Sequence, residues 1–442
     1  MHAPYSAGRA WVRRPRRNDG GAGMISADAW HVLRHRDFAL VCGARFAVTL
    51  ALQINIVAIG WYIYDVTGSA YALAYLGLAG FLPALILPLV TGLTADRIDR
   101  RLVMFFSDVM LTLTGLALLW LVASSDGVVW PIYLIMVLVS ASRAFHNPAG
   151  QAIIPALIPQ EQLSTGIAFA SSTFQAAQIL GPALGGILFA IDPRLPFAAA
   201  ALLYGLSSAA TLWIAPRPAA VSGKEPVTVK SLLAGFEFAL RKPVIFGAVA
   251  LDAAVVLLGG VVLLLPIFAK DILNVGAVGL GFLRAAPAVG AMLMALWLAN
   301  NDYVKRGTGR KLFATIMVYG IATALFGFST SFFLSIACLL VVGASDMISV
   351  VIRHTMVQAE TPNELRGRVA AVNSLFISSA SELSQFRAGA AAGLLGAVPA
   401  VVIGGVCAVG LSVLWPRLFP DLARRDHLVE PDSESTRESA KT

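Results

Sequence analysis

Long apolar runs separated by short polar segments follow one another along most of the chain. Twelve of these runs hold roughly the 20 residues that a helix needs to cross the hydrocarbon core of a bilayer. Their approximate limits are 38–64, 70–93, 102–123, 130–153, 164–190, 196–215, 244–268, 277–299, 312–329, 331–352, 369–396 and 398–415. The pattern predicts an all-α integral membrane protein with 12 transmembrane helices.

The widest polar gap in the series lies between the sixth and seventh runs and covers residues 216–243. A polar connector at the middle of twelve spans predicts two halves of six helices, 38–215 and 244–415. We expect the remaining segments, 1–37 and 416–442, to be polar tails. Met24 offers an alternative start of the chain, which would leave residues 1–23 outside the protein.

The two halves carry similar polar segments at corresponding places. Acidic and basic residues fill 96–101 between the second and third runs and 302–311 between the eighth and ninth, about 206 residues later. A Pro-x-Glu motif follows the fourth run at Pro159 and the tenth run at Pro362, 203 residues later. Two echoes at nearly the same offset indicate a duplicated half.

The composition supports the membrane assignment and excludes several classes of protein. Hydrophobic residues make up 57% of the 442 residues, charged residues make up 13%, and the mean hydropathy is +0.76. Soluble proteins have about 25% charged residues, so this chain cannot cover a water-facing surface. A soluble enzyme, a DNA-binding domain and a disordered scaffold are excluded. The three cysteines lie inside apolar runs with no metal-site spacing, so we expect no bound metal.

The formal net charge is +8, and the basic residues are unevenly distributed. If the N-terminus is cytoplasmic, 27 of the 33 Lys and Arg residues fall in cytoplasmic segments, and only Arg194 and Lys270 fall on the opposite side. This bias satisfies the positive-inside rule and predicts that both termini are cytoplasmic. The positive charge therefore reflects membrane topology, and we expect no nucleic-acid partner.

Ionisable residues inside the runs concentrate on spans 1, 4, 7 and 10, with further ones on spans 8 and 11. Such residues are costly in lipid and usually face a cavity or a partner. We therefore predict a water-accessible cavity lined by these spans, with spans 3, 6, 9 and 12 facing lipid. The candidate proton-coupling and substrate-binding residues are Asp252, Glu382, Asp346, Arg143, Arg45, Arg284, Gln53 and Asn55. Asp108, His146 and Arg387 also lie within runs.

Two interpretations of the acidic residues stay open. At about 1.5 Å per residue, Asp252 and Glu382 lie roughly 12 and 20 Å into their spans, near the middle of the bilayer. They could be neutralised structurally by Arg45, Arg143 or Arg284. Alternatively, one carboxylate alternates between proton and substrate, because burial favours its neutral form and a nearby cation favours its charged form.

Two short motifs resemble signatures of the major facilitator superfamily. Residues 92–101 resemble its loop between helices 2 and 3, Gly-x-x-x-Asp-Arg-x-x-Arg-Arg, except that Asp99 stands where the family often has Gly. The matching loop residues are Gly92, Asp96, Arg97, Arg100 and Arg101. Gly181, Pro182, Gly185 and Gly186 resemble the antiporter signature of helix 5.

Further motifs narrow the resemblance to one group of that superfamily. Arg143 matches the helix-4 arginine that the family links to proton coupling. The segments 143–159 and 361–369 look like those of the exporter subgroup that includes enterobactin and multidrug efflux proteins. The resemblance implies alternating access between two six-helix halves. Asp96 would pair with Arg100 or Arg101 as a cytoplasmic latch, although simple topogenic charge would also explain the arginines.

The resulting prediction is a secondary active transporter in the bacterial cytoplasmic membrane. It would export small, partly hydrophobic molecules, such as drugs or a siderophore, by proton antiport, as a monomer and without a cofactor other than the proton gradient. An importer or facilitator on the same fold is the alternative. A membrane receptor or enzyme is less favoured, because the chain has no nucleotide-binding, hydrolase or metal-spacing motif.

Overall fold

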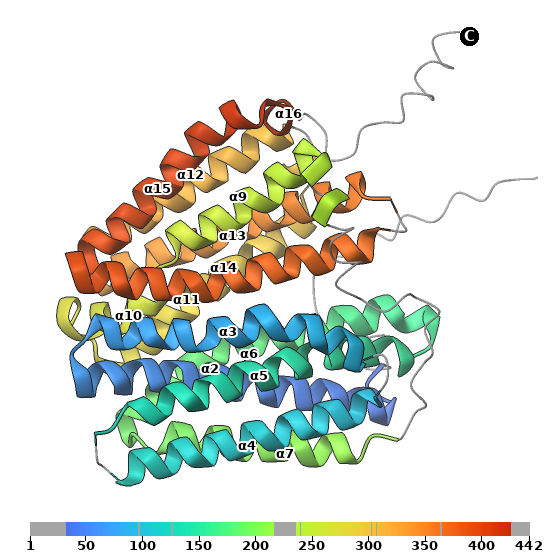
Figure 1. Cartoon of the computed structure of the whole chain (residues 1–442), viewed down its shortest axis with the longest axis vertical. Helices are drawn as coiled ribbons and strands as arrows, with labels where there is room; N and C mark the ends of the chain where they lie inside the picture. Colours follow the sequence, from blue (N-terminus) through green and yellow to red (C-terminus); the bar gives the residue numbers. More distant parts are fainter. Residues whose placement is uncertain are drawn as a thin grey trace, which may run out of the picture.

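The computed structural model describes residues 32–95, 98–124, 127–215, 236–238, 240–301, 303–305, 307–362 and 365–425. Within these ranges the chain forms 12 long helices and no strand (Figure 1). The long helices are α2 (Arg36–Thr67), α3 (Ala70–Ala95), α4 (Arg100–Ser124), α5 (Trp130–Ile153), α6 (Leu163–Ile191), α7 (Leu195–Leu212), α9 (Pro243–Gly259), α11 (Gly276–Ala299), α12 (Thr308–Phe328), α13 (Phe332–Glu360), α14 (Arg366–Leu395) and α15 (Ala397–Leu418). The predicted all-α fold is confirmed.

Two of the long helices are more polar than the others. Ten helical segments of the described chain are long and apolar enough to cross a membrane, and α5 and α14 are not among them. Both carry polar residues along their middle, such as Ser142 and His146 on α5 and Ser384 on α14, and these three side chains are buried. The two helices therefore turn polar groups toward the interior of the protein.

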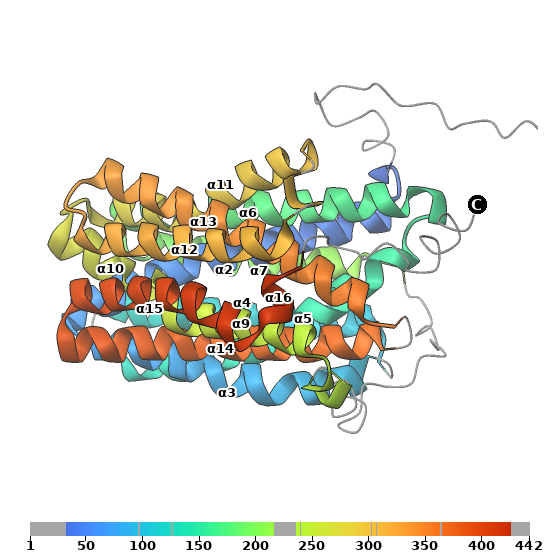
Figure 2. The ribbon, with the colours of Figure 1, turned by 90° about the horizontal axis from the view of Figure 1, so that it is seen from above.

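The helices form two groups of six, as the duplication predicts. Helices α2 to α7 pack together, and helices α9 and α11 to α15 form the second group, seen as the lower and upper halves in Figure 1. Figure 2 shows that the axes of the long helices are roughly aligned with one another. The main contacts between the halves are α3 against α14 and α6 against α11, which are spans 2 with 11 and 5 with 8. These pairs are equivalent under the duplication.

Glycines allow the backbones to touch at both of these crossings. A Cβ atom on Gly186 of α6 would lie 2.4 Å from the carbonyl oxygen of Ala277 in α11. At the second crossing, a Cβ atom on Gly389 of α14 would lie 2.7 Å from Cα of Ala74 in α3. A larger side chain at either place would force the halves apart.

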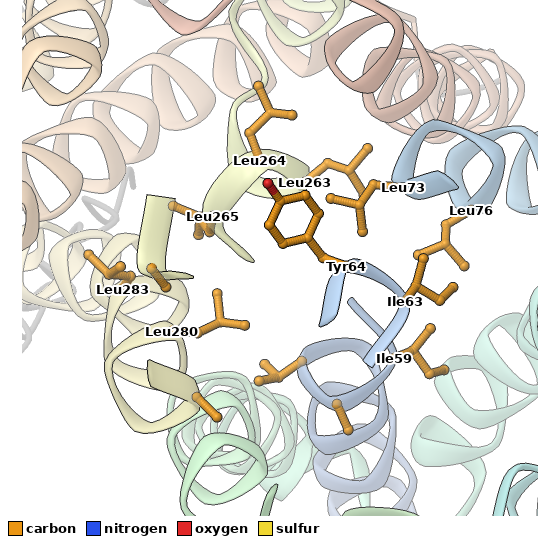
Figure 3. Close-up of a cluster of buried hydrophobic side chains, with 14 of the residues drawn as sticks. Ile59, Ile63, Tyr64, Leu73, Leu76, Leu263, Leu264, Leu265, Leu280 and Leu283 are labelled. Atoms are coloured by element: carbon orange, nitrogen blue, oxygen red, sulfur yellow. The ribbon is translucent and has the colours of Figure 1, made fainter. Parts of the chain in front are cut away.

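Among the residues that the structure describes, clusters of buried apolar side chains join the halves at one end of the bundle only. The largest cluster contains leucines and isoleucines of both halves, close to where α2 ends and α3 begins (Figure 3). At the opposite end, one cluster around Phe38 and Met104 belongs to the first half, and another around Leu312 and Ile352 belongs to the second. We call the joined end the closed end and the opposite end, where α2 begins and α15 finishes, the terminal end.

The seventh and tenth predicted spans differ from the structure. The seventh is not one continuous helix: α9 ends at Gly259, and the chain continues through η3 (Val262–Leu264), α10 (Leu265–Ile267) and the π-helix η4 (Phe268–Ile272). The tenth was predicted to end at residue 352, which left Arg353 in a cytoplasmic loop. This was wrong, because α13 continues to Glu360 and Arg353 is buried within it.

Candidate functional site

A central cavity of about 430 Å³ lies between the two halves. Its walls come from α2, α3 and α5 of the first half and from α9, α11, α12, α13 and α14 of the second, together with the broken segment after α9. Apolar side chains form much of the lining. The polar and charged residues that line it are Gln53, Arg143, Arg284, Tyr319, Asp346, Ser381, Glu382, Ser384 and Gln385.

Glu382 of α14 is the acidic group with the most partners in this cavity. The amide nitrogen Nε2 of Gln385 donates a hydrogen bond to its Oε2 atom at 2.8 Å. Two cations act on the carboxylate, Arg143 from the first half and Arg284 from the second. Gly80 of α3 makes room for it, since a Cβ atom there would lie 2.7 Å from Oε2. One acid therefore interacts with a cation from each half.

Asp346 of α13 is the second acid of the central cavity. Its side chain is exposed to the cavity rather than packed into the helix bundle. The neighbouring Tyr319 interacts with it electrostatically and donates a hydrogen bond to the carbonyl oxygen of Gly259 at 3.2 Å, where α9 breaks. Asp346 is thus placed where a solute in the cavity could reach it.

The structure brings five of the eight candidate residues together at this cavity. These are Gln53, Arg143, Arg284, Asp346 and Glu382. Spans 1, 4, 7, 8, 10 and 11 line the cavity as predicted, but α3 (span 2) and α12 (span 9) also contribute, and span 9 was predicted to face lipid. The roles of these residues in binding or coupling remain proposals.

Arg45 and Asn55 do not line the central cavity. Arg45 lines a second cavity of about 470 Å³ within the first half, together with Gln151 and Gln175. Asn55 is buried and its Nδ2 atom donates to the hydroxyl of Tyr204 at 3.4 Å. Side chains two residues apart on a helix point about 200° from each other. Gln53 lines the central cavity, so Asn55 points away from it.

Asp252 is also outside the central cavity, which corrects its predicted place. Its Oδ1 atom lies 2.8 Å from Nη2 of Arg353, and both side chains are at most 10% exposed. The sequence suggested Arg45, Arg143 and Arg284 as structural partners of Asp252 or Glu382; none of them forms this ion pair with Asp252, whereas Arg143 and Arg284 act on Glu382. The pair explains why Arg353 can stay buried, because a buried charge needs a partner of opposite sign.

The described part of the 92–101 motif ties helices of one half together. Arg100 donates through Nη1 to the carbonyl oxygen of Ala152 at 2.7 Å, at the end of α5. Arg101 donates through Nε to the carbonyl oxygen of Thr211 at 3.2 Å, at the end of α7. Cationic side chains bind favourably to the last carbonyl groups of a helix, where the helix dipole is negative.

Asp96, the predicted acid of the same motif, takes no part in these observed contacts. Gly92 lies in α3, and Asp96 and Arg97 lie outside the described residues. The predicted latch between Asp96 and the arginines therefore stays a prediction.

The glycine-rich motif of α6 sets the position of two neighbouring helices. A Cβ atom on Gly181 would lie 2.4 Å from Cβ of Gln53, and one on Gly185 would lie 2.9 Å from the carbonyl oxygen of Ile54. The opposite face carries Gly186 and the carbonyl oxygen of Pro182, which touch α11 of the other half. The motif thus allows α6 to pack tightly on α2 and across the interface at once.

Two polar contacts cross between the halves at the closed end, and sequence analysis missed both. Nζ of Lys270 lies 2.6 Å from Oδ1 of Asp65 at the end of α2. The hydroxyl of the adjacent Tyr64 donates a hydrogen bond to the carboxylate of Asp271 in η4. The available signal was an acid closing the first run and a Lys-Asp pair closing the seventh, at matching places in the duplicated halves.

A buried acid–base pair inside the first half was also missed as a site. Asp108 of α4 and His146 of α5 lie 2.8 Å apart, measured from Oδ1 to Nδ1. Both residues fall inside predicted spans, but the sequence alone does not show that they meet. Their contact depends on the packing of α4 against α5.

Two groups of apolar helices around a central cavity that holds both signs of charge define a multi-pass membrane transporter. Among the described residues there is no group of side chains that could hold a metal ion. Residues 41–385 match the Major Facilitator Superfamily, and the chain belongs to that family. It is therefore a transporter and not an enzyme.

Two of the relatives match most of the chain. Macrolide efflux protein A of Streptococcus pyogenes is 23% identical over 375 residues, which cover 82% of this chain and 90% of the relative. The enterobactin exporter EntS of Escherichia coli O1:K1 / APEC is 28% identical over 345 residues, covering 76% of this chain and 80% of that protein.

Solved structures show the same fold at lower identity. The nucleoside transporter NupG aligns with a TM-score of 0.68 at 12% identity, covering 88% of this chain and 99% of that chain. A POT family transporter in complex with 5-aminolevulinic acid aligns with a TM-score of 0.71 at 12% identity, covering 88% and 97%. At such identity the likeness concerns the fold alone.

Proposed function

We propose that this transporter exports small, partly hydrophobic molecules, drugs or a siderophore, by proton antiport. The observation that carries the proposal is Glu382, an acid in the central cavity that interacts with Arg143 of one half and Arg284 of the other. Relatives named for macrolide efflux and enterobactin export support the direction and the kind of substrate.

The chemistry of such a site is a competition between a proton and the substrate. Burial in the cavity favours the neutral, protonated form of a carboxyl group, while neighbouring cations favour the charged form. A substrate that binds next to Glu382 would displace the proton, and a returning proton would displace the substrate. Asp346, exposed in the same cavity, is the second candidate for this exchange.

The charge bias of the loops gives the proposed orientation. Basic residues concentrate at the terminal end, so that end would face the bacterial cytoplasm. The closed end would then face outward, and the structure would be an inward-facing state of a monomer. The segment 216–243 would connect the half 38–215 to the half 244–415, with both termini in the cytoplasm.

Transport by the purified protein in liposomes tests the proposal. The probes are a radiolabelled macrolide and a catecholate siderophore, and a pH-sensitive dye follows protons in the same vesicles. An imposed pH gradient should drive uphill movement of one probe together with opposite proton movement, and a protonophore should abolish both. Flux that is unaffected by the protonophore and never runs uphill would instead support a facilitator.

A further inference from the structure

A buried acid–base pair in the first half has no part in the central cavity. Oδ1 of Asp108 lies 2.8 Å from Nδ1 of His146, with side-chain exposures of 0% and 4%. The other carboxylate oxygen, Oδ2, accepts hydrogen bonds from the hydroxyls of Ser207 at 2.6 Å and Thr211 at 3.4 Å, both on α7. One oxygen is therefore occupied by hydroxyl groups, and the other faces the imidazole.

This geometry gives the pair two protonation states. Two lone pairs 2.8 Å apart would repel each other, so the pair holds at least one proton, on the imidazole or on the carboxyl group. We take the ring as the group that holds it. The second ring nitrogen, Nε2, is then either bare or protonated, and the pair carries a net charge of −1 or zero. Imidazole is the side chain that ordinarily changes charge near neutral pH.

The buried ion pair of the second half lacks this freedom. Asp252 is paired with Arg353 at 2.8 Å, and a guanidinium group does not release its proton in proteins. The cation of the Asp252–Arg353 pair therefore keeps its charge, and we treat the pair as structural. In the Asp108–His146 pair the base itself can gain or lose a proton.

Each neighbouring helix presents few charged or titratable groups to the pair. On α5 itself, Arg143 lies three residues before His146, and α7 contributes Tyr204, on whose hydroxyl both Arg143 and Asp108 act electrostatically. On α2, Arg45 packs against Gly150, four residues after His146. Helix α3, which also packs on α5, has no charged residue in its sequence.

Along α5, His146 lies between residues that line the two cavities. Arg143, one turn before it on α5, lines the central cavity, and Gln151, just over one turn after it, lines the second cavity. The buried Nε atom of Arg143 has no hydrogen-bond partner among the described residues. Residues that line both cavities therefore lie near His146 along α5, and Arg143 is not held by a hydrogen bond through its Nε atom.

We propose that Asp108 and His146 form a proton-binding site that controls the attraction between Arg143 and Glu382 across the two halves. When Nε2 is bare, the charged Asp108 competes with Glu382 for Arg143. When Nε2 binds a proton, the imidazolium neutralises Asp108, and the field of Arg143 acts on Glu382 or on an anionic group of the substrate. The proton enters from one cavity and leaves to the other as the halves move. This mechanism rests on the proposed proton antiport.

The first test compares driven transport with exchange for His146→Gln and Asp108→Asn in liposomes. Driven uptake of the labelled macrolide or siderophore under a pH gradient should fall roughly tenfold or more, as expected when a coupling between sites is lost. Counterflow exchange without a gradient should stay close to the wild-type rate. His35→Gln is the matched control, because His35 is half-buried at the terminal end and its ring forms a hydrogen bond with Gln162 of the same half at 3.2 Å.

A second measurement keeps the proposal testable if a variant does not fold. In Ser207→Ala the carboxylate loses a donor and should hold the imidazolium proton more tightly, so the pH at which driven transport is half-maximal should rise. Proton release on adding the transported probe to unbuffered, detergent-solubilised protein gives a direct readout. It should be equal in the wild type and His35→Gln and smaller in His146→Gln, in which only the carboxyl groups of the central cavity can release a proton.

The outcomes separate the two proposals. If the wild type moves no protons, the proposed antiport fails and this inference fails with it. If the wild type moves protons and His146→Gln couples them equally well, with an unchanged pH profile in Ser207→Ala, the antiport stands and the role of the pair is refuted. Loss of both driven transport and exchange in a folded His146→Gln variant would also contradict a role confined to coupling.

Discussion

The closed end depends on two polar contacts between the halves, so weakening them should open it. The change that we propose is the double substitution Tyr64→Phe and Lys270→Ala. It removes the hydrogen bond to Asp271 and the ion pair with Asp65, while the apolar cluster in Figure 3 stays in place. The expected result is a larger population of molecules that are open at this end.

The exposure of the groups sets the size of the effect. The Asp65 and Lys270 side chains are 52% and 34% exposed, so their ion pair contributes about 0.5 kcal/mol. A hydrogen bond to a charged acceptor contributes about 1.5 kcal/mol at the low end of its range, which suits the exposed Asp271. Together they amount to about 2 kcal/mol, or a change of about thirtyfold in the ratio of closed to open molecules.

Spin labels at the closed end measure this ratio. Ser69→Cys and Ser331→Cys would place one label on each half, in a protein whose three native cysteines have been replaced. The double variant should shift the distance distribution between the labels toward longer distances. Arg194→Ala is the control, because Arg194 is a basic residue at the same end and should leave the distribution unchanged. A double variant with the parent distribution would refute the reasoning.

Further predictions concern the packing of the halves and the buried pair of the second half. Gly186→Leu should lower the thermal stability of the folded protein by about 1–3 kcal/mol and block transport, since even a Cβ atom there meets a carbonyl oxygen at 2.4 Å. Arg353→Ala should cost about 3–5 kcal/mol by leaving a buried carboxylate unpaired. The double variant Asp252→Leu with Arg353→Met should recover stability and transport, as measured by thermal unfolding and flux. Continued loss of transport in that stable double variant would show that the pair has a role beyond structure.

The features that could be predicted from the sequence depend on local pattern. Runs of apolar residues indicate transmembrane helices, because a segment that crosses lipid must form all its backbone hydrogen bonds within its own helix. The clustering of charges on particular spans located the cavity, because a charge such as Glu382 cannot face lipid without a large cost. The glycines of α6 also predicted close helix packing from residue type alone, because a residue without a side chain lets two helix backbones lie close together.

The features that could not be predicted depend on which helices meet. Asp252 was assigned to the cavity because its depth in the span was known but its partner was not, and that partner lies about 100 residues away, at Arg353. Gln53 and Asn55 were grouped together although they point to different sides of α2. The contact between Asp108 and His146 and the contacts of the closed end arise from tertiary packing, which the hydropathy pattern does not contain.

The central claim is that the Glu382 carboxylate exchanges a proton for substrate. The most direct measurement is gradient-driven transport by Glu382→Gln in liposomes, with proton movement recorded in the same vesicles. The neutral amide keeps the size of the side chain but cannot release a proton, so both driven transport and coupled proton movement should be lost while exchange without a gradient persists. Full driven transport with unchanged proton movement in this variant would contradict the account.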